Sequence, residues 1–422
     1  MTRKNLYALF AILLTLSMLL TACGSPTTKA PAPVTQAPVV TDAPVVTEAP
    51  TVEAPKDPIK IGAIFDLTGG TADVGTPYGE GMKAYVEWRN ANGGIEGHQI
   101  DLSSADYAYK VDQAETLYTQ YVQDGVVAFM GWGTGDTEAL RTKIAEDKIP
   151  FMSASYSAAL LDMTAAPYNF LIGTSYSDQA IIAVRWAMDD WKAKGNADMP
   201  KVALIHHDSP FGQSPVADAK AFADANGVTF TDLAMPKGAT DYVAELAQMS
   251  TFGANYVIIQ NVSSPAALLL KDAKTQGFGA QFICLNWCAD EILVNLAGDA
   301  AEGVMGTIPF TPPSSPVAGH DDPDAWLKAN GSSLAEKGLH FSQGWWTMAV
   351  MAEGIARVIQ DGKEINGENI RAALESIQNF ETGGVTAPIS FAPDSHRGNA
   401  SLRLFKVEGG VWKVVSDFIS AE

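Results

Sequence analysis

Cysteine is scarce in this chain of 422 residues, which has only three. Cys284 and Cys288 form one short pair, and no second pair of cysteines or histidines lies close in sequence to complete the four ligands of a structural zinc. The sequence therefore predicts no metal site. A disulfide between Cys284 and Cys288 and two buried free thiols both remain open, because the sequence does not give the distance between their Cα atoms.

Positive charge is also in short supply. The chain has 28 lysines and arginines against 48 aspartates and glutamates, for a formal net charge of -20. Binding to nucleic-acid phosphates depends on clusters of basic side chains, and the sequence shows none. We therefore expect no nucleic-acid partner, and we interpret the acidity as a contribution to solubility.

Motifs of catalysis are missing as well. There is no Gly-x-Ser-x-Gly elbow, no Walker phosphate loop and no His-Glu-x-x-His pair. His206 and His207 end an expected strand, where adjacent side chains point to opposite faces, so a joint metal site is not expected. The sequence predicts a protein that is not an enzyme and needs no cofactor.

One long apolar run is present, and it lies at the N-terminus. It extends from Leu6 to Leu20 behind two basic residues and is followed by small residues and Cys23. A charged start and an apolar segment of this length are typical of an export signal. The end of the run resembles the lipobox of bacterial lipoproteins, which predicts a lipoprotein signal peptide over residues 1–22 and a lipidated Cys23. The alternative is an ordinary signal peptide that happens to contain a cysteine.

Residues 23–56 are rich in proline, alanine and threonine and have no periodic apolar face. Such a segment cannot bury a core and stays extended, at about 3 Å per residue in the polyproline conformation. We expect it to link a lipidated Cys23 to a folded body. The body is then extracytoplasmic and attached to the membrane.

From Ile59 onward, continuous apolar runs of strand length alternate with stretches of helical period. This alternation predicts parallel βαβ units whose strands are covered by helices on both faces. Expected strands lie at 59–65, 126–130, 201–205, 256–260 and 281–284, and expected helices include 78–90 and 180–194. Sheets of this kind bind ligands beyond the carboxyl ends of their strands.

Five segments resemble, in order along the chain, the branched-chain amino-acid-binding protein family, the type I solute-binding proteins of ABC transporters. They are Ile59–Phe65 with the glycine-rich turns that follow as far as Gly97, Met130–Gly133, Ile149–Ser155, His207–Gly212 and Ile389–Gly398. The resemblance implies an α/β protein with two Rossmann-like lobes joined by three crossovers, the type I periplasmic-binding-protein fold. The expected lobes are 57–172 with 309–383 and 175–305 with 387–422, with crossovers near 172–174, 306–309 and 383–387.

The resemblance also implies a ligand clamped between the lobes, with its carboxylate held by hydroxyls and backbone amides of the first lobe. The matching positions are Asp73, Val74, Trp132, Gly133, Thr134, Gly135, Asp136, Ser155, Tyr156 and Ser157. Ser155 and Ser157 could instead cap a helix. Asp136 would repel a carboxylate, so it could cap a helix or accept hydrogen bonds from a ligand amine.

In the second lobe the resemblance implies ligand contacts at Phe211, Asn261, Ser263, Asn286 and Trp287. Amino-acid binders of the family also have an acid near this last pair, which binds the ligand ammonium. That acid is missing here, and Asp290 and Glu291 just beyond are expected to begin a helix. The loss of a charge-assisted hydrogen bond, about 1.5–3 kcal/mol, argues against an α-amino acid. We expect instead a carboxylate or amide with an apolar or aromatic body, held against aromatic side chains that could otherwise belong to the core.

The function implied is that of the substrate-binding component of an ABC importer. It would take a small organic solute outside the cytoplasm, bind permease subunits and act as a monomer. The alternative is a ligand-sensing receptor module that signals through a membrane partner.

Overall fold

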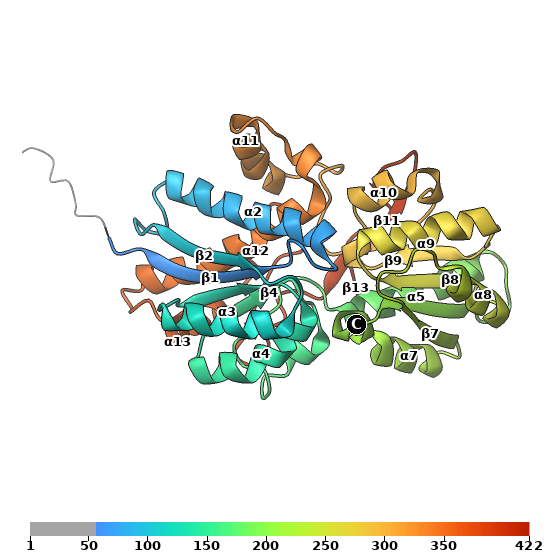
Figure 1. Ribbon diagram of the computed structural model, residues 1–422, viewed down its shortest axis with the longest axis horizontal. Helices are drawn as coiled ribbons and strands as arrows, with labels where there is room; N and C mark the ends of the chain where they lie inside the picture. Colours follow the sequence, from blue (N-terminus) through green and yellow to red (C-terminus); the bar gives the residue numbers. More distant parts are fainter. Residues whose placement is uncertain (1–55, 422) are drawn as a thin grey trace, which may run out of the picture. The chain divides into compact units, whose positions relative to one another are not determined.

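The computed structural model describes residues 56–421, all of which belong to one compact unit (Figure 1). The predicted signal peptide, Cys23 and nearly all of the predicted linker lie outside the described residues. Within residues 56–421, none of the helices combines the length and the apolar character needed to cross a membrane.

The first sheet contains the N-terminal strands of the described chain. Its five strands are parallel and lie in the order β2-β1-β3-β4-β5. Their bounds are β1 Ile59–Phe65, β2 Ile100–Asp106, β3 Ala128–Gly131, β4 Phe151–Ser153 and β5 Asn169–Phe170. Almost every residue of β1 and all of β3 and β4 are buried, as expected for strands covered on both faces.

Helices from two distant parts of the chain cover this sheet. The first part supplies α2 (Ala72–Ala91), α3 (Val111–Gln123), α4 (Thr134–Asp147) and the 3₁₀ helix η2 (Ala158–Leu161), and the second supplies α11 (Asp321–Ala329), α12 (Leu334–Gln360) and α13 (Gly367–Glu375). Figure 1 shows α2 on one face and α3 with α4 on the other. α12 packs along α2, and their backbones come closest where one of the two helices has a glycine. A Cβ added to Gly81 would lie 1.9 Å from the Phe341 carbonyl oxygen, and one added to Gly344 would lie 1.9 Å from that of Tyr78.

The second sheet has the order β12-β11-β10-β9-β8-β6-β7. Its strands are β6 Lys201–His207, β7 Thr229–Met235, β8 Tyr256–Gln260, β9 Gln281–Cys284, β10 Met305–Ile308, β11 Ser401–Val407 and β12 Trp412–Val414, and β13 (Ile419–Ser420) pairs with β11. The strands from β6 to β10 are parallel, whereas β11 and β12 are antiparallel to their neighbours. The two sheets confirm the predicted α/β class, and every expected strand range is occupied by a strand.

The helices between these strands are α5 (Tyr176–Ala193), α6 (Pro210–Gln213), α7 (Val216–Ala225), α8 (Val243–Phe252), α9 (Ser263–Gln276) and α10 (Glu291–Ala297), with short 3₁₀ turns η3 (Asn286–Cys288), η4 (Gly298–Ala300) and η5 (Ala318–His320). Cys284 at the end of β9 and Cys288 in η3 are both buried and free. Of the two alternatives left open for this pair, the structure has the buried thiols.

The last connection between the sheets corrects one predicted boundary. Residues from 387 onward were expected in the second lobe, yet Phe391 packs edge-on against Phe170 of β5, with ring centroids 5.2 Å apart. His396 stacks on the same ring at 3.7 Å. The chain therefore remains against the first sheet beyond His396 and joins the second only where β11 begins at Ser401. The boundary at 383–387 is wrong because the glycines there form a turn within the first part.

Candidate functional site

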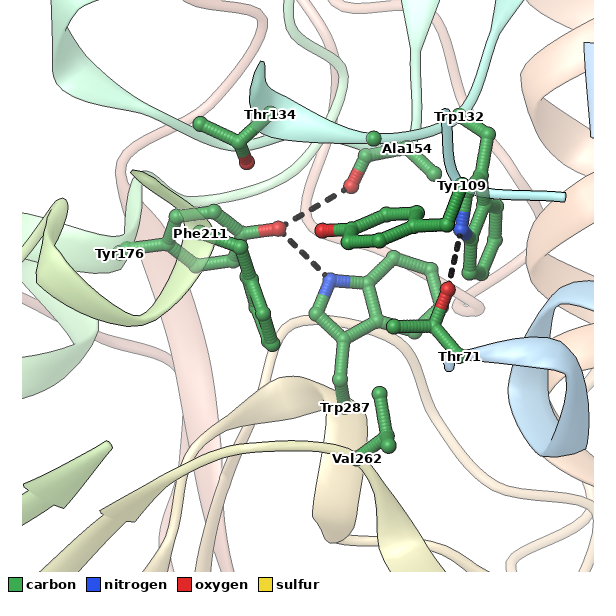
Figure 2. Close-up of a pocket in the computed structure, with 10 residues that line it drawn as sticks. Thr71, Tyr109, Trp132, Thr134, Ala154, Tyr176, Phe211, Val262 and Trp287 are labelled. Atoms are coloured by element: carbon green, nitrogen blue, oxygen red, sulfur yellow. Dashed lines mark hydrogen bonds between the residues drawn. The ribbon is translucent and has the colours of Figure 1, made fainter. Parts of the chain in front are cut away.

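A cavity lies where the carboxyl ends of the strands of both sheets meet, and the space within it, open solvent included, is about 230 Å³. It is lined by Thr71, Tyr109, Trp132, Gly133, Thr134, Ala154, Tyr176, Phe211, Val262 and Trp287 (Figure 2). Nearly all of these residues follow a parallel strand or begin the next helix. The cavity therefore occupies the position where open α/β sheets bind ligands.

Trp287 forms one wall of the cavity. Its indole Nε1 donates to the Tyr176 hydroxyl at 2.8 Å, and that hydroxyl lies 3.3 Å from the Ala154 carbonyl oxygen (Figure 2). The indole ring packs edge-on against Trp132 at 5.0 Å and stacks on Tyr156 at 5.9 Å. Because its N–H is already bonded, Trp287 offers the ligand an apolar ring.

Trp132 is held in a similar way from the first sheet. Its Nε1 donates to the Thr71 hydroxyl oxygen at 2.8 Å, and this hydroxyl donates to Asp66 Oδ2 at 2.7 Å. Thr71 and Asp66 are both buried. This chain of hydrogen bonds fixes the indole plane before a ligand arrives, which lowers the entropy cost of binding.

The polar side of the cavity is the N-terminus of α4. The helix begins at Thr134, and its N-cap, Gly133, has no side chain to occupy the first backbone N–H groups. The Thr134 hydroxyl lies 2.7 Å from the Ser155 hydroxyl, so only one of the two protons is used between them. Backbone N–H groups at a helix start carry partial positive charge, which suits an anionic or carbonyl oxygen.

Asp136 lies in the first turn of α4, behind Gly133, and does not line the cavity. Its Oδ1 accepts a hydrogen bond from the Tyr107 hydroxyl at 2.8 Å. A Cβ on Gly133 would lie 2.2 Å from this oxygen, so glycine is needed where the carboxylate passes. Burial raises the pKa of Asp136 to about 6, although the Tyr107 hydrogen bond opposes the shift.

Asp290 is the acid that follows Trp287 most closely in the sequence. It is the N-cap of α10, as the sequence predicts, and its Oδ1 accepts from the Leu293 N–H at 2.7 Å. Its Oδ2 accepts from the Ser263 hydroxyl at 2.5 Å and from His340 Nε2 at 2.6 Å. Asp290 is completely buried. Its oxygens are therefore engaged within the protein and do not reach the cavity.

His340 of α12 is a residue that sequence analysis missed. Its ring stacks on Trp287 with centroids 5.0 Å apart, and its Nδ1 lies 2.6 Å from Gln343 Oε1. Burial alone would lower the pKa of His340, but the hydrogen bond and the charge of Asp290 outweigh burial, and the net shift is upward. This pair connects α12, on the first sheet, with α10, beside the second.

The predicted site residues fall into three groups. Trp132, Gly133, Thr134, Phe211 and Trp287 line the cavity, and Asn261 lines a second cavity described below. Ser155, Tyr156, Ser263, Asn286, Gly135 and Asp136 lie directly behind lining residues or in the hydrogen-bond networks that hold them.

The third group lies elsewhere. Val74 is in the hydrophobic core. Asp73 Oδ2 accepts a hydrogen bond of 2.8 Å from the Ser264 N–H at the start of α9. This bond links α2, on the first sheet, to α9, on the second. Ser157 caps η2 and donates to Glu138, so the capping alternative is the one the structure shows. Sequence analysis missed the lining residues Tyr109 and Tyr176. Tyr176 comes shortly after the apolar residues Phe170–Ile172, whereas Tyr109 follows β2, whose largely polar sequence gave no signal.

The chain is similar to known binding proteins over most of its length. Residues 58–411 match the family of periplasmic binding proteins. A Pseudomonas aeruginosa protein named as a leucine-, isoleucine-, valine-, threonine- and alanine-binding protein is 25% identical over 325 residues, covering 75% of this chain and 83% of that protein.

Two solved structures are similar over most of the chain. A branched chain amino acid ABC transporter protein from Thermus thermophilus, with bound valine, has 27% identity and a TM-score of 0.82, covering 86% of this chain and 97% of that one. An ABC transporter substrate binding protein from Aeropyrum pernix has 29% identity and a TM-score of 0.78, covering 87% and 97%. Since the family match runs through both sheets and the cavity between them, the chain belongs to the periplasmic binding protein family.

Proposed function

We propose that this protein captures a small organic solute in the cavity lined by Trp132, Phe211 and Trp287 and delivers it to the permease subunits of an ABC importer. The solute is a carboxylate or amide with an apolar or aromatic body. Family membership and the solved relatives support the transport role. The ligand-sensing alternative would use the same cavity, and nothing observed in residues 56–421 favours it.

One observation carries the choice of ligand. The cavity is lined by aromatic rings, two threonines and small residues, with no aspartate or glutamate among them, in a chain that has 48 acids. A ligand ammonium would therefore be buried without an opposite charge, which is costly. Relatives are named for leucine, isoleucine and valine, but for this chain we propose that these amino acids bind weakly.

The orientation of the ligand follows from the two sides of the cavity. The carboxylate or amide oxygen accepts hydrogen bonds at the start of α4, from backbone N–H groups and the Thr134 hydroxyl. The apolar body packs against Trp132, Trp287 and Phe211, whose rings are already held in place. Asp73 and Asp136 then support the cavity from outside.

The location belongs to the same proposal. An export signal over residues 1–22 and lipidation of Cys23 would attach the protein to the outer face of a membrane, with residues 23–56 as the linker. Family membership supports the extracytoplasmic location. In this position a monomer could present its loaded cavity to the permease.

Isothermal titration of the purified full-length protein, stripped of carried-over solute, tests the ligand class. We expect 3-phenylpropanoate to bind at least about tenfold more tightly than leucine, isoleucine or valine, the equivalent of about 1.4 kcal/mol. Thr134→Val, which removes the hydroxyl with little change of shape, should weaken the acid by about 1 kcal/mol.

The control is Thr116→Val on exposed α3, which should leave binding unchanged. Micromolar leucine binding that is lost in Asp136→Asn would overturn the proposed ligand class. It would make Asp136 the partner of a ligand ammonium.

A further inference from the structure

A second and larger cavity adjoins the first. The space within it, open solvent included, is about 1140 Å³, and Tyr109 lines both cavities. Asn261 of the larger cavity precedes Val262 of the smaller one, and the His207 and Phe211 rings lie 6.0 Å apart across the same junction. The larger cavity is lined by Gly70, Ala108, Tyr109, His207, Met235, Pro236, Lys237, Gly238, Ala239, Tyr242, Asn261, Ser264, Pro265 and Leu268.

Among the side chains that line the larger cavity, one carries a charge at neutral pH. The carboxylates of Asp73 and Asp272 lie behind this lining, where they accept hydrogen bonds from the backbone N–H groups of Ser264 and Tyr242. Lys237 is the only lysine or arginine among the lining residues of the two cavities, and neither lining contains an aspartate or glutamate. Lys237 makes no ion pair with any residue in the range 56–421. His207 does not add a second cation at neutral pH, because burial and the nearby Lys237 lower its pKa to about 4.

An apolar path leads from the smaller cavity toward Lys237. Met235 and Tyr242 are buried and Leu268 is half-buried, and all three line the larger cavity. The Asn261 amide is turned onto the Met235 sulfur at 3.0 Å. A flexible hydrocarbon chain that leaves the aromatic cavity past Tyr109 would therefore remain on apolar surface before it reaches the ammonium group.

We propose that the larger cavity is a second subsite for an elongated ligand with two anionic ends, one at the start of α4 and the other, a carboxylate, at Lys237. This inference rests on the proposed function, because it takes the first carboxylate to be bound in the smaller cavity. It adds that the natural solute is longer than an α-amino acid and carries an acidic tail.

The expected gain is modest, because Lys237 is exposed at the edge of the cavity. An exposed ion pair is worth a few tenths of a kcal/mol to 1 kcal/mol, which corresponds to an affinity about two- to fivefold higher. Salt should reduce the gain, because an exposed charge pair is screened.

Titration of the full-length protein with a matched ligand series tests the proposal. The parent is 3-phenylpropanoate, and its derivatives carry at the para position an alkyl chain of increasing length that ends in a carboxylate or, as the uncharged match, in a primary amide. Beyond a certain chain length, the carboxylate should bind about two- to fivefold more tightly than its amide. Lys237→Met should remove this difference, and Lys237→Arg should retain it.

Two further variants separate the subsite from general effects. Leu268→Trp, which fills the larger cavity, should weaken the long ligands of both kinds and leave the parent acid unchanged. Lys274→Met, at the far end of α9, should change neither. Equal affinities for carboxylate and amide at every length, with the parent acid still bound, would overturn the second subsite alone. If the parent acid itself does not bind, the proposed function fails and the second subsite fails with it.

Discussion

The buried pair of His340 and Asp290 gives a prediction about what holds the two sheets together. We consider His340→Phe, which keeps an aromatic ring to stack on Trp287 but removes both ring nitrogens. Asp290 Oδ2 then loses a partner at 2.6 Å in a place where the exposed fractions of the two side chains are 1% and 0%. Removing one member of a buried charge pair costs about 3–5 kcal/mol.

The lower end of that range applies, because Asp290 keeps the Ser263 hydroxyl and the Leu293 N–H. We therefore expect His340→Phe to lower the free energy of unfolding by about 3 kcal/mol at pH 6. The pKa of His340 is raised in the folded protein, so its charge stabilises fully below the unfolded value of about 6.5. As the pH rises through the folded pKa, the charge is lost and the effect of the variant falls toward about 1 kcal/mol, the value of a neutral hydrogen bond.

Urea unfolding of the full-length protein, followed by tryptophan fluorescence at pH 6 and at pH 9, measures both values. The double variant His340→Phe with Asp290→Asn should lower the free energy of unfolding by at least about 1 kcal/mol less than the two single variants together, because the two side chains are in contact. The control is His98→Phe, since the half-buried His98 ring lies within hydrogen-bond distance of the backbone oxygen of Asp57 and has no carboxylate partner among the described residues. A loss below about 1 kcal/mol at pH 6 would show that the pair is not charged.

Three other changes test separate features. Cys23→Ser should abolish detergent partitioning of the expressed protein, because two acyl chains anchor stably, and release of unmutated protein without a lipidated Cys23 would contradict the lipobox. The free energy of unfolding of Asp136→Asn should exceed that of the wild type by about 2–3 kcal/mol more above pH 6 than at pH 4. The pKa of Asp136 is raised to about 6, so ionising this carboxylate destabilises the wild type. Unfolding curves at pH 4.5 and 7.5 that show the same difference between the two proteins would refute this. Gly81→Ala should cost more than about 2 kcal/mol by clashing with the Phe341 carbonyl, whereas Gly279→Ala, with open space around it, should be nearly neutral in the same assay.

Sequence periodicity predicted the fold well because the strands are buried on both faces. The runs at 59–65 and 256–260 coincide with β1 and β8, and their continuous apolar character is the direct result of helices on either side. The helix expected at 78–90 begins at Ala72 in the structure. The prediction placed its start too late because Pro77 and three glycines weaken the helical signal of its first turns. The last crossover was misplaced, since stacking of His396 on Phe170 depends on a contact between distant segments.

The site was predicted only where its residues follow strands. Trp132 and Trp287 each come directly after an apolar run, so their position at the cavity could be inferred from topology. His340 lies within a long buried helix, and nothing near it in sequence indicates that it reaches Asp290. The sequence indicated a missing acid, and the lining of the smaller cavity contains no aspartate or glutamate, but the sequence could not show that Lys237 lines the adjoining cavity.

The close crossing of α2 and α12 also determines the order in which the first sheet can mature. α12 begins only at residue 334, so a chain emerging from the ribosome has completed the five strands of this sheet long before the helix that covers α2 exists. Contacts of such large sequence separation form slowly. Until then the apolar side of α2 stays exposed to proteases and to other chains. We therefore expect that residues 57–172 do not fold by themselves, and that a fragment ending at residue 172 aggregates although it contains all five strands.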